Sequence, residues 1–251
     1  MLKAEHLRYT VDDAGGPETI IRDVSFTVED GEILVVTGPN GGGKSTIAKL
    51  LMGIIQPDGG SIVLNGQEIS GLSIDQRSKA GMGFAFQQPP RFKGMTVRRL
   101  LNLAAGKELP EEVCCGLLSS VGLCAREYLN READQTLSGG EMKRIEIATV
   151  FAKKHALSIF DEPEAGIDLW SFSMLVRQFE MMQRERDESL LIISHQERIL
   201  RMADHILVIA DGLVQNFGTR DEILPQILAE QTMPEGCACS RRGEEGFHHG
   251  A

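Results

Sequence analysis

Hydrophobic and polar residues along the chain follow two periods, and these predict strands and helices in alternation. Residues 4–9 and 20–29 alternate apolar with polar side chains, as half-buried strands do, and a third strand predicted over 31–37 contains the wholly apolar run ILVV of a buried strand. Further strands are predicted at 61–64, 157–160 and 190–193, and helices at 45–52, 140–153 and from Asp168 onward. This alternation predicts an α/β fold in which helices cover a parallel sheet.

Residues 89–137 interrupt the alternation. After two consecutive prolines the segment carries apolar residues at helical spacing, and a second helical segment follows near 113–121. The first helix is marked by Val97, Leu100, Leu101 and Leu103. We therefore predict a helical subdomain, residues 89–137, inserted into a core formed by residues 1–88 and 138–222.

The end of the chain, residues 223–251, is predicted to hold a C-terminal helix and a disordered tail, because Gly and charged residues dominate from Glu230 onward. Thiolate and imidazole suit Zn and Fe–S centres, so the tail is also a candidate metal or cluster site. The simpler interpretation is a tail with unpaired thiols. The candidate ligands are Cys237, Cys239, His248 and His249.

Composition narrows the possible partners. The chain has 251 residues, of which 42% are hydrophobic and 25% charged, and its formal net charge is −10. Such an acidic chain lacks the clustered Lys and Arg of a nucleic-acid-binding surface. Its first residues are charged, and no apolar stretch approaches the ~20 residues that span a bilayer. We expect a cytoplasmic protein that neither binds nucleic acid nor inserts directly into a membrane.

A glycine-rich loop is the first candidate for chemistry. The sequence GPNGGGKS fits the G-x-x-x-x-G-K-[ST] pattern and lies between a predicted strand and a predicted helix. Glycines let backbone N–H groups surround phosphate oxygens, and the helix adds the positive end of its dipole. Lys44 supplies charge for the β- and γ-phosphates, Ser45 is a ligand for Mg²⁺, and Thr46 lies near the α-phosphate. We predict that ATP is bound by Gly38, Pro39, Asn40, Gly41, Gly42, Gly43, Lys44, Ser45 and Thr46.

Two adjacent carboxylates follow the apolar strand predicted at 157–160. Open α/β sheets bind their ligands at this carboxyl end of the strands. With a phosphate loop present, Asp161 is predicted to hold Mg²⁺ through its water shell. Glu162 is predicted to polarise the attacking water.

A second anion-binding helix terminus is predicted at Ser138-Gly139-Gly140-Glu141, where a hydroxyl and two glycines open a helix. A γ-phosphate that is already bound by the glycine-rich loop does not need a second anion-binding site from the same chain. We therefore predict that Ser138, Gly139, Gly140 and Glu141 bind the nucleotide of a second copy, in a head-to-tail dimer that forms on ATP binding.

The motifs, in their order along the sequence, resemble those of the ATP-binding cassette (ABC) ATPases. The resemblance covers residues 1–222 and rests on GPNGGGKST, FAFQQ, LSGGE, SIFDE, AGID and IISHQ. It implies a P-loop NTPase of ABC type, in which a mixed sheet has a RecA-like core and an N-terminal antiparallel β subdomain. It further implies that Gln87 contacts Mg²⁺, that Asp168 communicates across the dimer, and that His195 holds the γ-phosphate and Glu162 in register. Lys44, Glu162 and His195 are then the catalytic candidates.

Taken without the family, two of these residues have simpler interpretations. A lone histidine after an apolar strand, as His195 is, is usually structural. Asp168 precedes a predicted helix and suits its N-cap, a role that is compatible with the other. The family's adenine-stacking aromatic aligns with Val11, with Tyr9 on the same strand face, so modest ATP affinity and weak discrimination against GTP are expected.

Two processes are candidates for using this ATPase. The run EMKRIE after the signature, the segment AFQQPPRFKGMTV and the run ERIL after the histidine resemble the ATPase of the Suf iron–sulfur assembly system. The main expectation is therefore a Suf-type soluble ATPase whose partner is a scaffold. The alternative is the ATP-binding subunit of a membrane transporter, peripheral to the inner membrane and partnered by a permease, since DEPEAG is compatible with many transporter ATPases.

Overall fold

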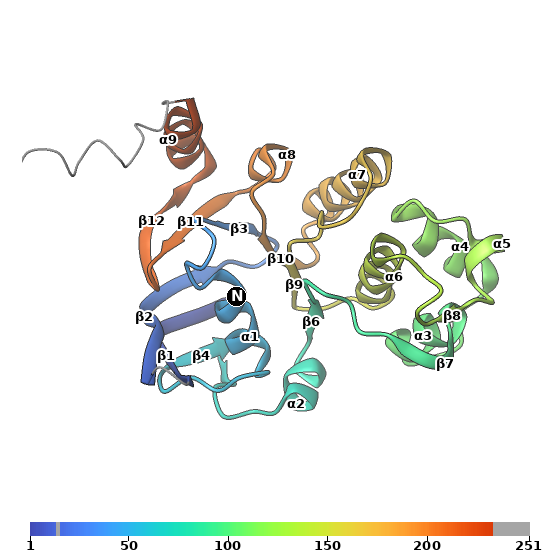
Figure 1. The fold of residues 1–251 in the computed structure, drawn as a ribbon, viewed down its shortest axis with the longest axis horizontal. Helices are drawn as coiled ribbons and strands as arrows, with labels where there is room; N and C mark the ends of the chain where they lie inside the picture. Colours follow the sequence, from blue (N-terminus) through green and yellow to red (C-terminus); the bar gives the residue numbers. More distant parts are fainter. Residues whose placement is uncertain (14–15, 233–251) are drawn as a thin grey trace, which may run out of the picture.

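The computed structural model describes residues 1–13 and 16–232, and its centre is one mixed sheet (Figure 1). The strand order is β5-β4-β1-β2-β12-β11-β3-β10-β9-β6. Five neighbours, β11, β3, β10, β9 and β6, run parallel, and β1, β2, β4 and β5 pair antiparallel at the other end. The strands are β1 Leu2–Asp13, β2 Gly16–Val28, β3 Ile33–Thr37, β4 Gly59–Leu64, β5 Gln67–Glu68, β6 Met82–Ala85, β9 Leu157–Asp161, β10 Ser189–Ile193, β11 His205–Ala210 and β12 Leu213–Thr219. The expected mixed sheet with antiparallel N-terminal strands is confirmed.

Helices cover the parallel strands on both faces. They are α1 Lys44–Met52, α2 Ile74–Lys79, α6 Gly139–Phe151, α7 Leu169–Glu185, α8 Glu197–Leu200 and α9 Arg220–Thr232. Within β3, Ile33 and Val35 belong to one hydrophobic cluster while Leu34 and Val36 belong to the other. Because successive side chains of a strand point to opposite faces, the wholly apolar run of β3 serves two cores.

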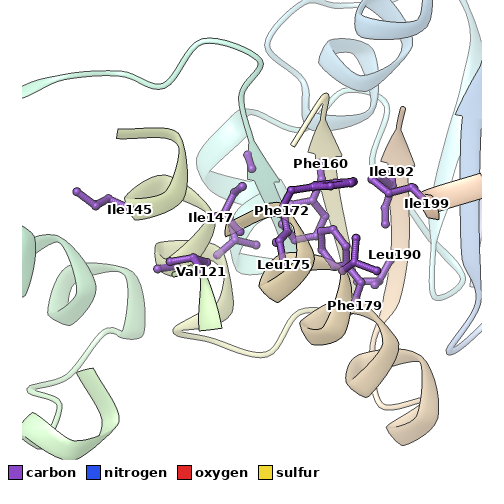
Figure 2. Packing of buried hydrophobic residues seen from close by; sticks show 14 of the residues in the cluster. Val121, Ile145, Ile147, Phe160, Phe172, Leu175, Phe179, Leu190, Ile192 and Ile199 are labelled. Carbon is purple, nitrogen blue, oxygen red and sulfur yellow. The ribbon is translucent and has the colours of Figure 1, made fainter. Parts of the chain in front are cut away.

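The larger cluster joins the sheet to α6 and α7 (Figure 2). Phe160 of β9 packs edge-on against Phe179 of α7, with ring centroids 4.9 Å apart. Each fully buried aromatic side chain of this kind contributes roughly 1.5–3 kcal/mol. This packing fixes the carboxyl end of β9, where the two acidic residues lie.

Residues 89–137 form helices that stand beyond α6, away from the sheet (Figure 1). The helices are α3 Val97–Ala105, α4 Glu111–Ser120 and α5 Ala125–Tyr128. Strands β7 Phe92–Thr96 and β8 Glu132–Ala133 pair with each other, and the hydrophobic pattern did not predict this ribbon. The helix predicted from Val97, Leu100, Leu101 and Leu103 is present as α3, in which the first three are buried and Leu103 is 69% exposed.

The C-terminal helix begins and ends differently from the prediction. It starts at Arg220 and continues to Thr232, so residues 230–232 are helical and not part of a disordered tail. The rest of the predicted tail, with Cys237, Cys239, His248 and His249, lies outside the described residues. In the part of the chain that the structure describes, no helix is long and apolar enough to cross a bilayer.

Candidate nucleotide-binding site

The glycine-rich loop follows β3 and leads into α1, and its backbone has conformations that side chains disfavour. Gly38, Gly41 and Gly43 have φ of 132°, 78° and 103°. A Cβ on Gly38 would lie 2.0 Å from the carbonyl oxygen of Ile209, so only glycine fits there. Gly43 caps α1 without a side-chain hydrogen bond, which leaves the first N–H groups of the helix available for phosphate oxygens.

Lys44 is a buried side chain that the loop itself holds. Its Nζ donates to the carbonyl oxygens of Gly38 at 2.8 Å and of Pro39 at 2.9 Å. Burial lowers the pKa of Lys44, and the nearby carboxylates of Glu162 and Asp161 oppose that shift. The ammonium is thus kept at the phosphate loop, close to both acidic residues.

Asp161 and Ser45 meet at the end of β9. The Ser45 hydroxyl donates to Asp161 Oδ1 at 3.0 Å, and Asp161 is 1% exposed. Burial raises the pKa of Asp161, while the hydrogen bond from Ser45 opposes the shift. A buried carboxylate that carries this cost beside a hydroxyl is a hard-oxygen donor set that fits Mg²⁺, which takes few protein ligands and keeps waters and phosphate oxygens.

Glu162 has a strained backbone and a fixed carboxylate. Its φ is 45°, in the left-handed region, and its N–H donates to the carbonyl of Ile193 at 3.0 Å. Gln87 Nε2 donates to Glu162 Oε2 at 2.8 Å, so the structure brings these two predicted residues together. One carboxylate oxygen of Glu162 is thereby oriented.

His195 lies in the loop after β10. Its Nδ1 is 3.3 Å from Oγ1 of Thr37, the last residue of β3. Burial lowers the pKa of His195, the charge of Lys44 lowers it further, and Glu162 opposes the shift. The imidazole is therefore neutral at physiological pH and can accept as well as donate a hydrogen bond.

Most of the predicted site residues line a cavity of about 690 Å³, but Gly38, Pro39 and Asp161 are not among its lining residues. Sequence reasoning missed part of its wall: Ile20 of β2 lines it, whereas Tyr9 and Val11 do not. The wall consists of Ile20, Asn40, Gly41, Gly42, Gly43, Lys44, Ser45, Thr46, Gln87, Glu162, Glu164, Ala165, His195 and Gln196. Only contacts between distant strands could have identified Ile20 and Thr37, because neither belongs to a motif.

The Ser138–Glu141 stretch begins α6 and is absent from the cavity wall. Ser138 is the N-cap: its Oγ accepts from the Glu141 N–H at 3.2 Å, and Glu141 Oε2 accepts from the Ser138 N–H at 2.7 Å. The hydroxyl of Tyr128 donates to Glu141, and this bond lowers the pKa of Glu141 to about 2. The capping box leaves Ser138 and Gly139 exposed at a rigid helix terminus.

A close approach joins this terminus to the loop before α7. A Cβ on Gly140 would lie 2.2 Å from the carbonyl oxygen of Gly166, so glycine is required. Two residues later, Asp168 caps α7 by accepting from the N–H groups of Trp170 and Ser171, both at 3.0 Å. The N-cap interpretation of Asp168 is thus confirmed.

Two buried charges on α6 were not predicted to belong to the site. Lys143 Nζ donates to the carbonyls of Phe86 and Asp161, and Glu146 Oε1 accepts from the Phe86 N–H at 2.9 Å. The residue next to Phe86 is Gln87. We refer to Lys143, Glu146 and Phe86 as the α6 clasp, because these bonds tie the helix to the segment that carries Gln87.

The buried carboxyl of the clasp makes stability depend on pH. Burial raises the pKa of Glu146 from 4.5 to about 7, so the folded protein binds this proton more tightly than the unfolded chain. The stability from that proton is present at acidic pH and is lost as pH rises from about 4.5 through about 7. In Glu146→Gln, an amide keeps the bond to Phe86 without this loss. We expect the free energy of unfolding of Glu146→Gln, relative to wild type, to rise by about 1–3 kcal/mol between pH 5 and pH 8.

Urea unfolding of both proteins at the two pH values measures this difference. Glu180→Gln, an exposed change on α7, is the matched control and should give the same difference at both pH values. A pH-independent difference for Glu146→Gln would contradict the assignment.

Comparison with known proteins decides the family. A family model described as ABC transporter matches residues 21–165, more than half of the chain. The chain belongs to the ABC ATPases. The predicted ATPase activity is confirmed with it.

Relatives of this ABC ATPase are named as parts of transporters. An uncharacterised ABC transporter ATP-binding protein of Methanocaldococcus jannaschii is 39% identical over 83% of this chain and 86% of its own length. The sulfate/thiosulfate import ATP-binding protein of a Synechocystis strain is 30% identical over 83% of this chain, which spans 59% of that protein. The Suf-type specificity finds no support in these names.

Solved structures confirm the ABC fold. A dimeric ATP-binding cassette in a post-hydrolysis state, bound to ADP and Pi, has a TM-score of 0.79 at 21% identity, covering 88% of this chain and 99% of that one. A Clostridium perfringens protein that is part of an ABC transporter complex has a TM-score of 0.71 at 25% identity, covering 92% of this chain and 93% of that one.

Among the described residues that line the cavity there is no Phe, Tyr or Trp, and Ile20 is the one contributed by the N-terminal strands. Phosphate contacts do not distinguish ATP from GTP, and an aliphatic side chain offers neither stacking nor a hydrogen bond to the base. We expect dissociation constants for ATP and GTP within about tenfold of each other, a difference of ~1.4 kcal/mol. Calorimetric titration of both nucleotides measures this, and low-micromolar ATP binding with strong preference over GTP would contradict it.

Proposed function

We propose that two copies of this ABC ATPase hydrolyse ATP at head-to-tail interfaces, in which Ser138, Gly139 and Gly140 of one copy cover the nucleotide bound by the other. One observation carries this proposal: the exposed α6 terminus lies outside the wall of its own chain's cavity. An N-terminal helix end attracts phosphate, and a head-to-tail arrangement gives it one.

Within one site the residues divide the work of hydrolysis. The loop N–H groups and Lys44 bind the β- and γ-phosphates and offset the charge that develops on the leaving ADP. Glu162, oriented by Gln87, takes a proton from the water that attacks the γ-phosphorus as the bond to the β–γ bridging oxygen breaks. His195, neutral and held near Thr37, hydrogen-bonds the γ-phosphate.

Ser45, Asp161 and Gln87 would hold Mg²⁺. When bound, the ion supplies charge neutralisation on the β- and γ-oxygens. Asp161 is suited to this role by its position, since β9 delivers it beside the Ser45 hydroxyl.

Mixing two inactive variants tests the shared site. Lys44→Ala disables the phosphate loop and Ser138→Arg blocks the α6 terminus, so each variant alone is expected to be inactive. A mixed dimer holds one intact site, formed by the loop of one chain and the terminus of the other. Random pairing limits the recovered activity to roughly one quarter of wild type. A mixture as inactive as its components would refute the head-to-tail arrangement.

For the coupled process, we propose a membrane permease as the partner, with the ATPase peripheral to the membrane on the cytoplasmic side. The names of the transporter relatives support this. Opening and closing of the dimer would then drive alternating access.

A second candidate, a soluble Suf-type scaffold, has one specific observation in its favour. Glu146, part of the run that resembles the Suf ATPase, is a buried member of the α6 clasp and not a surface substitution. Isolation of the native complex separates the two: a partner that needs detergent for extraction supports the permease, and a detergent-free complex that contains iron supports the scaffold.

A further inference from the structure

The loop between β9 and α7 carries an acidic residue that the mechanism above does not use. Glu164 stands two residues after Glu162 and lines the nucleotide cavity. Its Oε1 accepts a hydrogen bond from the hydroxyl of Ser194 at 2.6 Å. Ser194 is fully buried and directly precedes His195. Glu164 is therefore tied to the start of the His195 loop.

The same hydroxyl holds the residue on the other side of His195. Ser194 Oγ accepts from the N–H of Gln196 at 3.0 Å, and the Ser194 N–H donates to the carbonyl of Val36 at 3.2 Å. Hydrogen bonds that run from Glu164 through Ser194 to Gln196 thus hold the residues on both sides of His195. The imidazole itself has one longer contact, 3.3 Å to Thr37.

The loop that carries Glu164 is held at its own backbone. The N–H of Ala165 donates to the carbonyl of Glu162 at 3.0 Å, and the N–H of Ile167 donates to the carbonyl of Glu164 at 3.1 Å. These two turns fix Glu164 relative to Glu162. A carboxylate on a rigid loop can hold a neighbouring loop in a fixed position.

A carboxyl at this position is costly, which argues against a neutral packing role. Burial raises the pKa of Glu164, the hydrogen bond from Ser194 opposes that shift, and the negative charge of Glu162 adds to it. A shorter apolar residue would avoid the cost and lose the bond to Ser194.

We propose that Glu164 is a positioning residue for ATP hydrolysis. Through Ser194 it fixes the His195 loop relative to Glu162, so that the imidazole of His195 contacts the γ-phosphate while the carboxylate of Glu162 contacts the attacking water. This proposal rests on the role given to His195 above. It does not depend on the dimer.

The experiment compares Glu164→Ala, Glu164→Gln, Ser194→Ala, His195→Ala and the double variant Glu164→Ala/His195→Ala, by kcat, KM for ATP, ATP affinity and melting temperature. Misplacing a reacting group by about 1 Å costs on the order of 100-fold, so Glu164→Ala is expected to lower kcat ten- to 100-fold with ATP affinity within about threefold. Glu164→Gln keeps an acceptor for Ser194 and should recover most of that loss. Exposed Glu180→Ala is the control for surface charge.

The double variant distinguishes positioning from a general structural effect. If Glu164 acts through His195, removing the imidazole costs little once Glu164 is gone, so the two losses do not add. Ser194→Ala, a small change that preserves packing, should reproduce the loss of Glu164→Ala, which keeps the test valid if Glu164→Ala folds poorly.

Three outcomes would overturn the proposal: wild-type kcat in Glu164→Ala, no recovery in Glu164→Gln, or losses that add fully in the double variant. A wild-type kcat in His195→Ala would refute instead the role of His195 in the proposed mechanism. The two failures are thus separable.

Discussion

Replacing Glu162 by Gln is expected to remove ATP turnover while ATP binding persists. The amide keeps the size of the side chain and still faces Gln87, but it cannot take a proton from the attacking water. General-base assistance is worth about 10²–10⁴ in rate, so kcat should fall by at least ~100-fold. Phosphate release gives the rate, and calorimetric titration gives ATP affinity, which should change less than about threefold because the phosphate contacts remain.

The same variant should accumulate as an ATP-bound dimer if hydrolysis separates the copies, and size-exclusion chromatography with and without Mg-ATP detects it. Glu180→Gln, on the exposed face of α7, is the charge-matched control and should turn over ATP normally. Wild-type turnover in Glu162→Gln would refute the assigned role.

Lys44→Ala is expected to weaken ATP binding itself. The side chain is buried at the loop, where burial lowers its pKa and two carbonyls hold its ammonium. Without this ammonium, the β- and γ-phosphates lack a positive partner in a site that already holds the carboxylates of Asp161 and Glu162. Truncating one partner of such a buried charge pair costs about 2–5 kcal/mol, which corresponds to a loss of affinity of roughly 30-fold or more.

Equilibrium dialysis with labelled ATP measures this loss. The matched control is Lys79→Ala on α2, whose exposed ammonium pairs with Asp75 at 2.8 Å and should not affect binding. The melting temperature of Lys44→Ala should stay near that of wild type, because the removed ammonium is desolvated in the fold. ATP affinity within a few-fold of wild type would contradict the prediction.

The glycine-rich loop and the acidic pair could be predicted because each is contiguous in sequence and follows an apolar strand. The conformational demand is local there, and the residue types that meet it are few. The order of the motifs then identified the family. None of that required knowing how distant strands pair.

Other features depended on such pairing and stayed hidden. Ile20 reaches the cavity because β2 lies next to β12 in the sheet, and Thr37 meets His195 because β3 lies next to β10. Glu164 gains its partner in the same way. Leu103 carried the helical period of its neighbours but points away from the core, since an apolar period of three and four residues tolerates one exposed member.

The α6 clasp also has a mechanical consequence. α3 and α4 both pack on α6, so a movement of α6 carries the inserted helices with it. Lys143, five residues from Ser138, holds α6 near its N-terminal end to Phe86 and to the end of β9. At 1.5 Å per residue, Ser138 lies ~7.5 Å from Lys143 along the helix axis. Because Tyr128 of α5 also donates to Glu141 in the first turn of α6, a tilt of the inserted helices about this contact moves the α6 terminus together with them.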